Sequence, residues 1–400
     1  MLFNRFRSHS PHYFSKDPSR GLHGLYWAVS LMDFGIAAIS LFEPIFLFSI
    51  GYTLAEILFF YVILYGVYLV LLPVIGSWVG RLGYEHSIFY SHFFLIAAYL
   101  TLFGISEVSA LYYVAPVIFA IQKALYWPAY HADLTIFSRA GQRGREVGYI
   151  EMVSMVMMII GPMAGGLILG WFNFSVLFIV VTGLILLSAL PLLHIKEIHA
   201  RVQLSYRETV LQLFSREHRR SFFAFFGFGE ELIALVAWPV FLYVVIGNYL
   251  TVGWVVSSAT LATALLVLWF GHLTDKYPRL NILRAGTLLY VVTWLVRGLI
   301  RSVPAALALH GSARLAKEMV YIPMESIRLE KARRVGPLSY AIFFEMSLAL
   351  GKIVAGLIGF YSATYLSDPW NIIFMTAAFF SLLYFFKKDE PRPFPFIRAL

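Results

Sequence analysis

The sequence predicts an all-α integral membrane protein of about twelve transmembrane helices, arranged in two six-helix halves. Of its 400 residues, 60% are hydrophobic and 13% are charged, and the mean hydropathy is +0.75, whereas a soluble domain carries about 25% charged residues. A bilayer-crossing helix needs about 20 apolar residues, and such stretches follow one another along the chain. A β-barrel would instead read as alternating segments of about ten residues, but runs such as 176–193 are apolar on every face.

The apolar segments define the predicted spans and the boundaries between them. In chain order the spans are 25–49, 55–79, 87–105, 109–133, 146–169, 174–193, 222–246, 252–274, 282–301, 304–325, 337–361 and 370–386. They give an N-terminal bundle over 25–193 and a C-terminal bundle over 222–386. A polar central loop, 194–221, separates the bundles, and the tails are 1–24 and 387–400.

The basic residues predict the orientation. Most of the 31 Lys and Arg residues lie in the two tails and in the loops on one side, and short loops rich in these residues stay in the cytoplasm. The first 24 residues lack the apolar core of a signal peptide. We therefore expect both termini to be cytoplasmic tails of a protein in the bacterial inner membrane.

Internal repetition indicates that the two halves are parallel copies of each other. Four motifs recur in the same order at an almost constant offset: Glu43-Pro44-Ile45-Phe46-Leu47 with Trp238-Pro239-Val240-Phe241-Leu242, Gly76 with Gly271, Tyr126-Trp127-Pro128 with Tyr321-Ile322-Pro323, and Glu151-Met152 with Glu345-Met346. One pairing alone is weak evidence, but four in order are difficult to attribute to chance. We expect a pseudo-twofold axis between the halves.

Two loops resemble the major facilitator superfamily signature G-x-x-x-D-R/K-x-G-R/K, which follows helices two and eight of that family. The second loop matches at Gly271, Asp275, Lys276 and Arg279, with Pro278 in place of the later glycine. The first keeps Gly76, Arg81 and Gly83, but Gly80 replaces the acid and Tyr84 the final base. The resemblance covers the chain from Leu25 to Lys388, and it implies that these loops gate one face of the transporter.

The fifth span resembles the signature of proton-coupled antiporters in the same family. The matching residues are Gly148, Gly161, Pro162, Gly165 and Gly166, and Met157 stands where the middle glycine belongs. The resemblance implies export of a drug or other solute in exchange for protons. A proline kink beside small residues is also what a tight helix-packing seam requires, so packing alone is an alternative explanation.

Ionisable residues inside the spans are the candidate substrate-binding and proton-binding groups, because a charge in hydrocarbon persists only beside a partner or a wet cavity. They are Asp33, Lys123, Glu151, Glu230, Glu231, Arg314, Lys317, Glu318, Glu345 and Lys352, and Tyr126 and Trp127 share a helix face with Lys123. They lie on spans one, four, five, seven, ten and eleven. In the resembled family these helices line or flank the central cavity. Each charge is equally compatible with a structural salt bridge.

A proton carrier must be a carboxyl group that is buried in one state and hydrated in another. The candidates are Asp33, Glu151, Glu230 and Glu345. Asp33 and Glu230 are favoured because helices one and seven line the cavity in the resembled family.

Several functions find no support in the sequence. It contains no cysteine, no phosphate-binding loop and no serine nucleophile elbow, and His131 with Asp133 lacks a third metal ligand. We expect a monomeric secondary transporter in the lipid bilayer, not an enzyme, that moves a small organic solute by alternating access. It needs no nucleic acid, metal or cofactor, and the proton gradient supplies the energy.

Two other functions stay open at this point. One is uptake of an anionic metabolite by proton symport, with Lys123, Arg314, Lys317 and Lys352 binding the anion. The other is a receptor or scaffold of the same fold that no longer transports, which the altered first loop at Gly80 allows.

Overall fold

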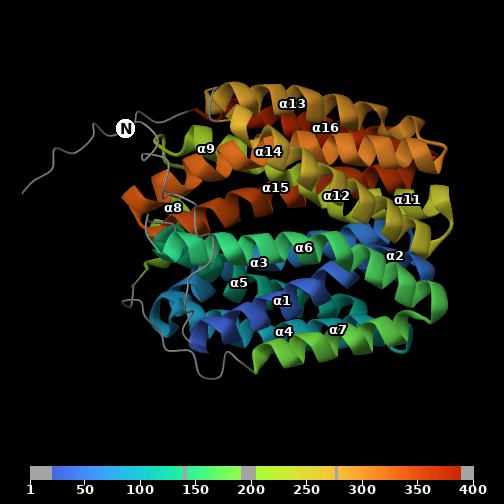
Figure 1. Cartoon of the computed structure of the whole chain (residues 1–400), viewed down its shortest axis with the longest axis horizontal. Helices are drawn as coiled ribbons and strands as arrows, with labels where there is room; N and C mark the ends of the chain where they lie inside the picture. The colour runs from blue at the N-terminus through green and yellow to red at the C-terminus, as the bar shows by residue number, and fades with distance from the viewer. Residues whose placement is uncertain (1–19, 138–141, 191–203, 275–277, 389–400) are drawn as a thin grey trace, which may run out of the picture.

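The computed structural model describes residues 20–137, 142–190, 204–274 and 278–388, and these ranges are helical without a strand. The helices run along one common direction and form two groups (Figure 1). The helices of the first half are blue to green, and those of the second half are yellow to red. The all-α membrane fold predicted from the sequence is confirmed.

Each predicted span coincides with one helix or with consecutive helical segments. The first half contains α1 (Arg20–Ser40), α2 (Glu43–Ser49), α3 (Leu54–Leu82), α4 (Tyr84–Phe103), η1 (Gly104–Ser106), α5 (Leu111–Phe137), α6 (Gln142–Trp171) and α7 (Phe174–Ala189). After the short α8 (Tyr206–Gln212), the second half contains α9 (Arg219–Phe226), η3 (Gly227–Gly229), α10 (Glu230–Leu232), η4 (Ile233–Ala237), α11 (Trp238–Ile246), α12 (Tyr249–Thr274), α13 (Arg279–Val296), η5 (Arg297–Leu299), α14 (Val303–Val335), α15 (Pro337–Tyr365), α16 (Trp370–Leu382) and η6 (Leu383–Phe386).

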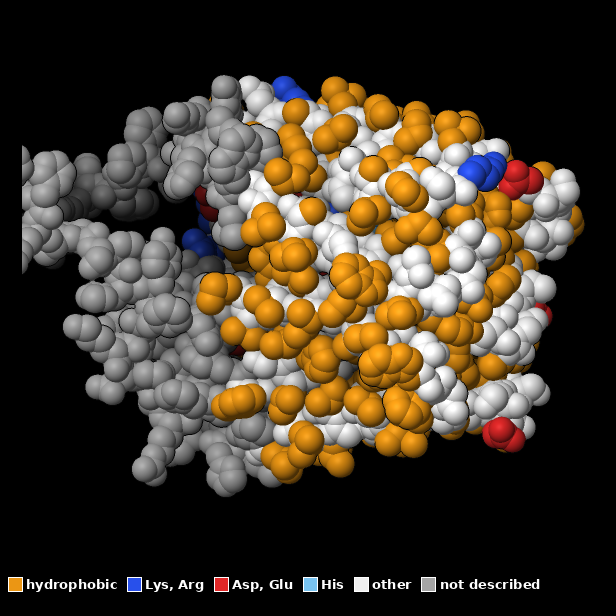
Figure 2. Space-filling model, turned by 45° about the vertical axis from the view of Figure 1, so that its right-hand side comes forward, with side chains coloured by type: hydrophobic (Ala, Val, Ile, Leu, Met, Phe, Trp, Pro, Cys, Tyr) orange, Lys and Arg blue, Asp and Glu red, His pale blue; other side chains and the backbone are white. Residues whose placement is uncertain are grey.

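The surface of the bundle is suited to lipid. Within the described ranges, eight helical segments are long and apolar enough to cross a membrane, and Phe174–Ala189 and Trp370–Phe386 are shorter apolar helices. Helices α5 and α14, which carry Lys123, Arg314 and Lys317, run beside them. Figure 2 shows a side of the bundle covered mainly by hydrophobic side chains. Exposing so large an apolar surface to water is unfavourable, whereas lipid chains cover it without cost.

The two halves repeat the same helix contacts, as the repeated motifs predict. In the first half α4 packs against α5 and α7, and α3 packs against α5. The second half repeats these pairs as α13 with α14 and α16, and α12 with α14. The halves meet where α3 packs against α15 and α12 against α6. Exchanging the halves turns one of these contacts into the other, which is the property of a pseudo-twofold axis.

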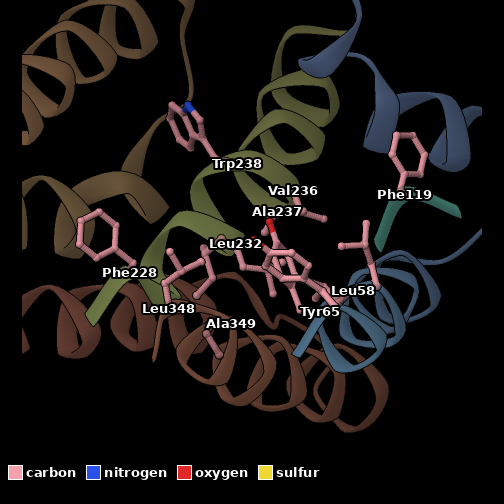
Figure 3. Close-up of a cluster of buried hydrophobic side chains, with 14 of the residues drawn as sticks. Leu58, Tyr65, Phe119, Phe228, Leu232, Val236, Ala237, Trp238, Leu348 and Ala349 are labelled. Atoms are coloured by element: carbon pink, nitrogen blue, oxygen red, sulfur yellow. The ribbon is translucent and has the colours of Figure 1, made fainter. Parts of the chain in front are cut away.

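An apolar core fills the seam between the halves. Figure 3 shows one part of it, a cluster to which Leu58 and Tyr65 of α3 and Leu232 and Leu348 of the second half contribute. Gly76 of α3 is buried, and a Cβ atom there would collide with the side chain of Ile342 on α15. The glycine therefore allows the close approach of α3 and α15, as small residues do between membrane helices.

Local signals in the sequence fix the helix ends. Thr53 and Glu56 form a capping box at the start of α3, with the Thr53 N–H donating to Glu56 Oε2 at 2.8 Å and the Glu56 N–H donating to Thr53 Oγ1 at 3.3 Å. Gly83, with φ of +104°, makes the direct turn from α3 to α4. We call the end of the bundle with the Gly83 turn the terminal end, because α1 begins there. The end with Thr53 is the far end.

A shared proline follows an irregular turn at the repeat-related positions of spans one and seven. Pro44 follows the interruption between α1 and α2, and Pro239 follows the π-helical turn η4. A proline has no N–H to donate and its ring clashes with the carbonyl four residues earlier, which explains both irregularities. The motif that identifies the repeat therefore also fixes a feature of the backbone.

Candidate functional site

A cavity of about 390 Å³ lies between the two halves, in the size range of small-molecule sites. Eight of the predicted site residues line it: Lys123, Trp127, Glu230, Glu231, Arg314, Lys317, Glu345 and Lys352. Residues that the sequence analysis did not select, among them Tyr65, Tyr68, Tyr290, Arg297 and His310, complete the polar part of its wall. The cavity draws side chains from both halves, as a site that serves alternating access must.

Two carboxylates and two ammonium groups form one connected network on the wall of this cavity. Lys317 pairs with Glu230 and with Glu231, the second contact spanning 3.2 Å, and Lys352 pairs with Glu231 at 3.0 Å. Glu230 is fully buried, and it also accepts hydrogen bonds from Tyr290 at 2.7 Å and Tyr384 at 2.8 Å. All four charged groups thus have a partner, which is the condition for charge inside a membrane.

The first half contains a similar arrangement of residue types. Glu43 accepts hydrogen bonds from Tyr99 at 2.9 Å and from Tyr61 at 3.5 Å, and Lys123 lines the same cavity of about 140 Å³. Tyr126 also lines this smaller cavity. Lys123 interacts electrostatically with Glu43, but no ion pair within 4.0 Å joins it to a described residue. The repeated halves therefore each place one lysine near a glutamate that holds two tyrosine hydroxyls.

A second polar chain crosses from one half to the other on the terminal side of the cavity. Tyr68 on α3 donates to Glu345 on α15 at 2.8 Å, and Nε2 of His131 on α5 lies 2.9 Å from Glu345 Oε1. Nδ1 of His131 lies 3.1 Å from Arg328 on α14, which pairs with Glu325. We call these five residues the cross-half chain. Three of its contacts join the halves.

Several predicted residues lie outside the cavities. Asp33 accepts a hydrogen bond from Ser154 where α1 packs against α6, and it lines neither cavity. Glu318 lies near Arg314 but also lines neither. Glu151 and Gly148 are in α6, but the side chain of Glu151 is outside the described part of the structure.

The signature loops are described only in part. Gly76 lies in the seam between the halves, Gly83 forms the turn, and Arg81 is exposed at the end of α3. Gly271 is in the last part of α12, and Asp275 and Lys276 lie outside the described residues. Arg279 forms two hydrogen bonds with Glu330, at 2.8 and 2.9 Å. This pair ties α13 to α14 within one half.

The antiporter-like motif of α6 faces two neighbouring helices. Cβ atoms added at Gly161 and Gly165 would collide with Ala37 and Ala38 of α1, and one at Gly166 would lie 2.9 Å from the carbonyl oxygen of Tyr249. Pro162 lies in the same turn, inside α6. These positions form a packing seam between α1, α6 and α12, so close approach accounts for the small residues whatever the direction of transport.

Sequence reasoning missed much of the polar wall. Glu43 was noted only as part of a repeat, and His310 was not considered. Tyr126 was the only tyrosine selected, yet other tyrosine hydroxyls donate to Glu43, Glu230 and Glu345. The sequence did contain a signal for Glu43. This residue lies inside a predicted span, as the other candidate charges do, and it is six residues from the end of that span.

The fold and the site define a polytopic membrane protein with a solute-sized cavity between two related halves. A family model described as the Major Facilitator Superfamily matches residues 25–246, which is more than half of the chain. The chain therefore belongs to the Major Facilitator Superfamily. It is a secondary transporter and not an enzyme.

Solved structures agree with this assignment at the level of the fold. A crystal structure of the nucleoside transporter NupG is similar with a TM-score of 0.65 and 14% identity, covering 92% of this chain and 98% of that one. A mutant of NupG gives a TM-score of 0.68 with the same identity and coverage. No curated protein matches the sequence.

Proposed function

We propose that the protein moves a small organic solute across the bacterial inner membrane by alternating access, as a monomer, and that protons drive the movement without a cofactor. The family supports alternating access, in which the two halves rock about a central site. Glu345 is the carboxyl group that the geometry favours as the proton carrier. It belongs both to the cavity wall and to the cross-half chain, so its protonation acts on the solute site and on the contacts that join the halves on the terminal side.

The partners of Glu345 carry this proposal. A tyrosine hydroxyl can donate to a carboxylate or accept from a carboxylic acid, and a histidine can give up or take a proton. Glu345 can therefore change protonation while Tyr68 and His131 stay beside it. Glu230 differs, because its protonation would leave Lys317 with one carboxylate fewer. This comparison favours Glu345 over Glu230, and Asp33 lines neither cavity.

Two coupling modes are proposed. Export in exchange for protons is the mode that the α6 motif predicts, and proton symport of an anion is the second candidate. The second is favoured by charge: the described residues that line the larger cavity include five Lys or Arg and three Glu. If the next experiment detects neither mode, the remaining candidate is a scaffold that does not transport.

Replacing Glu345 with Gln is expected to abolish proton-driven accumulation while solute exchange across the membrane continues, because the amide mimics the protonated acid. The measurement uses purified protein in liposomes with a pH-sensitive dye inside and a panel of nucleosides, amines and carboxylates added outside. Nucleosides are included because the structure of the nucleoside transporter NupG is similar in fold. Antiport makes the interior more alkaline when solute enters, and symport makes it more acidic.

Glu107→Gln is the matched control, since Glu107 is exposed at the far end and lines neither cavity. This variant should keep the coupling of the wild type. If Glu345→Gln still accumulates solute against its gradient, Glu345 is not the carrier. If no solute moves protons in the wild type, proton coupling is wrong.

Both termini are proposed to lie in the cytoplasm, on the basis of the loop charges. Because the chain has no cysteine, single cysteines report the orientation directly. Glu107→Cys and Asp368→Cys at the far end should react with an impermeant thiol reagent added to intact cells. Arg334→Cys at the terminal end should react only after the cells are opened. All three positions are exposed, and the reverse labelling pattern would invert the proposed topology.

A further inference from the structure

Three cationic or donor side chains on the cavity wall form no ion pair within 4.0 Å with a described residue, although Glu230 and Glu318 lie near enough to act on the two arginines electrostatically. Arg297 and His310 are almost fully buried, at 3% and 8% exposure, and Arg314 lies one helical turn from His310 on α14. Buried atoms without a hydrogen-bond partner are Arg297 Nε and Nη1, His310 Nε2 and Arg314 Nε. A buried donor left without an acceptor costs free energy, so this group calls for an explanation.

The three side chains form one group that faces the cavity. Arg297 and Arg314 both lie near enough to His310 to interact with it electrostatically, and all three line the cavity. Trp238 donates its Nε1 hydrogen to His310 Nδ1 at 2.9 Å, so the neutral histidine carries its own hydrogen on the unpaired Nε2. Arg297, His310 and Arg314 therefore each present at least one N–H group that has no acceptor among the described residues.

Tryptophan rings hold the arginine in place without neutralising it. The Arg297 guanidinium carbon lies 3.5 Å from the centre of the Trp294 ring and 4.3 Å from that of Trp238. Cation–π contacts stabilise a guanidinium and fix its plane, but they leave its N–H groups free to donate. Arg297 is thus oriented before any ligand arrives.

The neighbouring carboxylates are committed elsewhere. Glu230 is held by Lys317, Tyr290 and Tyr384, and Glu231 by Lys317 and Lys352. Glu318 lies near Arg314 but forms no ion pair with it within 4.0 Å among the described contacts, and it does not line the cavity. The described carboxylates therefore pair with Lys317 and Lys352 of the cavity. None of them pairs within 4.0 Å with Arg297 or Arg314, whose buried N–H groups lack an acceptor.

We infer that Arg297, His310 and Arg314 bind an oxyanion group, a carboxylate or a phosphate, of the transported solute. Guanidinium groups present paired donors that match the geometry of such oxyanions. Ala234, Leu235 and Leu348 line the same cavity and suit an apolar body attached to the anionic group. The substrate class is then a small organic anion with an apolar part. This inference rests on the proposed transport function, since it names the solute of that site.

Binding of simple oxyanions to the purified full-length protein in detergent tests the site. The probes are acetate, inorganic phosphate, benzoate and the neutral analogue benzamide, and the readout is the midpoint of thermal unfolding at increasing probe concentration. Benzoate and at least one simple oxyanion should raise the midpoint of the wild type, whereas benzamide should not. Acetate against phosphate tells which oxyanion is preferred, and either preference supports the site.

The double variant Arg297→Gln/Arg314→Gln should bind the oxyanions about 10- to 100-fold more weakly, which corresponds to losing charge-assisted hydrogen bonds. Arg301→Gln is the matched control. Arg301 is exposed and donates to the carbonyl oxygens of Gly298 and Ile300, so this variant should respond as the wild type does. The control also removes general salt effects on unfolding from the comparison.

The single variant Arg314→Gln gives an independent readout. It leaves Arg297 on its two tryptophans and removes a cation that forms no ion pair within 4.0 Å with a described residue, so without oxyanion it should unfold at or above the wild-type midpoint. A clear fall in that midpoint would mean that Arg314 is structural and would overturn the inference. So would an equal response of wild type and double variant to every probe, or an equal response of the wild type to benzoate and benzamide.

Failure of this inference is distinguishable from failure of the proposed function. The binding measurement uses no membrane gradient, so a protein without proton coupling still reports on the site. If proton coupling is found and the oxyanion response does not depend on the arginines, only the assignment of the substrate class is overturned.

Discussion

Replacing Lys317 with Met is expected to lower the free energy of unfolding by about 3 to 5 kcal/mol, the cost of leaving a buried charge without its partner. Lys317 is the cation that pairs with Glu230, whose side chain is completely buried. Tyr290 and Tyr384 would still donate to the carboxylate, but two neutral donors do not balance a charge in this environment. Thermal unfolding in detergent and the yield of monodisperse protein measure the loss.

Two further variants make this test specific. Lys317→Met combined with Glu230→Gln should recover most of the loss, because the amide removes the charge, accepts from one tyrosine through its oxygen and donates to the hydroxyl oxygen of the other through its NH2. Lys123→Met is the matched control in the other half, since Lys123 lines the cavities without an ion pair to a described residue. It should cost much less. A Lys317→Met protein as stable as the wild type would mean that cavity water solvates Glu230.

Replacing His131 with Phe is expected to open the terminal end of the transporter. The substitution removes both contacts through which His131 joins Glu345 to Arg328, and it keeps a ring between Trp127 and Phe344. Two charge-assisted hydrogen bonds contribute about 3 kcal/mol or more together, so the ratio of open to closed protein should rise by about 100-fold. Faster reaction of a thiol reagent with Thr135→Cys reports the opening.

The reporter and the control are chosen from the same region of the structure. Thr135 is fully buried, and its carbonyl oxygen accepts from Arg333 of the other half at 3.4 Å. His92→Phe is the matched control, because His92 is equally buried but bonds only to the carbonyl oxygen of Ile88 on its own helix. Equal thiol reaction rates in the two histidine variants would show that the cross-half chain does not hold this end closed.

The helices were predictable because the bilayer imposes a simple rule on the sequence: each crossing needs a long apolar run. The pairing of the halves was predictable for a different reason, since Pro44 and Pro239 or Glu151 and Glu345 occupy related positions in a repeat. Membership of the superfamily followed from the two loops. These signals are local or periodic along the chain, so a single sequence is enough to detect them.

The partners of the buried charges were not predictable in the same way. Sequence reasoning favoured Asp33 because of its helix, but a helix has several faces, and the face of Asp33 meets Ser154 of α6. It selected Glu345 without finding His131 or Tyr68, which come from other helices in the other half. Such contacts depend on how helices rotate against one another. The hydropathy pattern does not predict how a helix is rotated about its axis when most of its faces are apolar.

The irregular turns beside Pro44 and Pro239 in spans one and seven have a consequence for the mechanics of the transporter. Beyond them, α2 and α11 pack against each other across the halves, with Phe48 edge-on to Tyr243 at 6.4 Å. An intact helix transmits a tilt along its whole length, whereas a broken one lets the outer segment pivot over the few residues at the break. The far end can then part while the inner turns keep Glu230 and Lys317 in register. Span seven thus combines an outer segment that can move, α11, with an inner turn that carries Glu230 and Glu231 of the charge network.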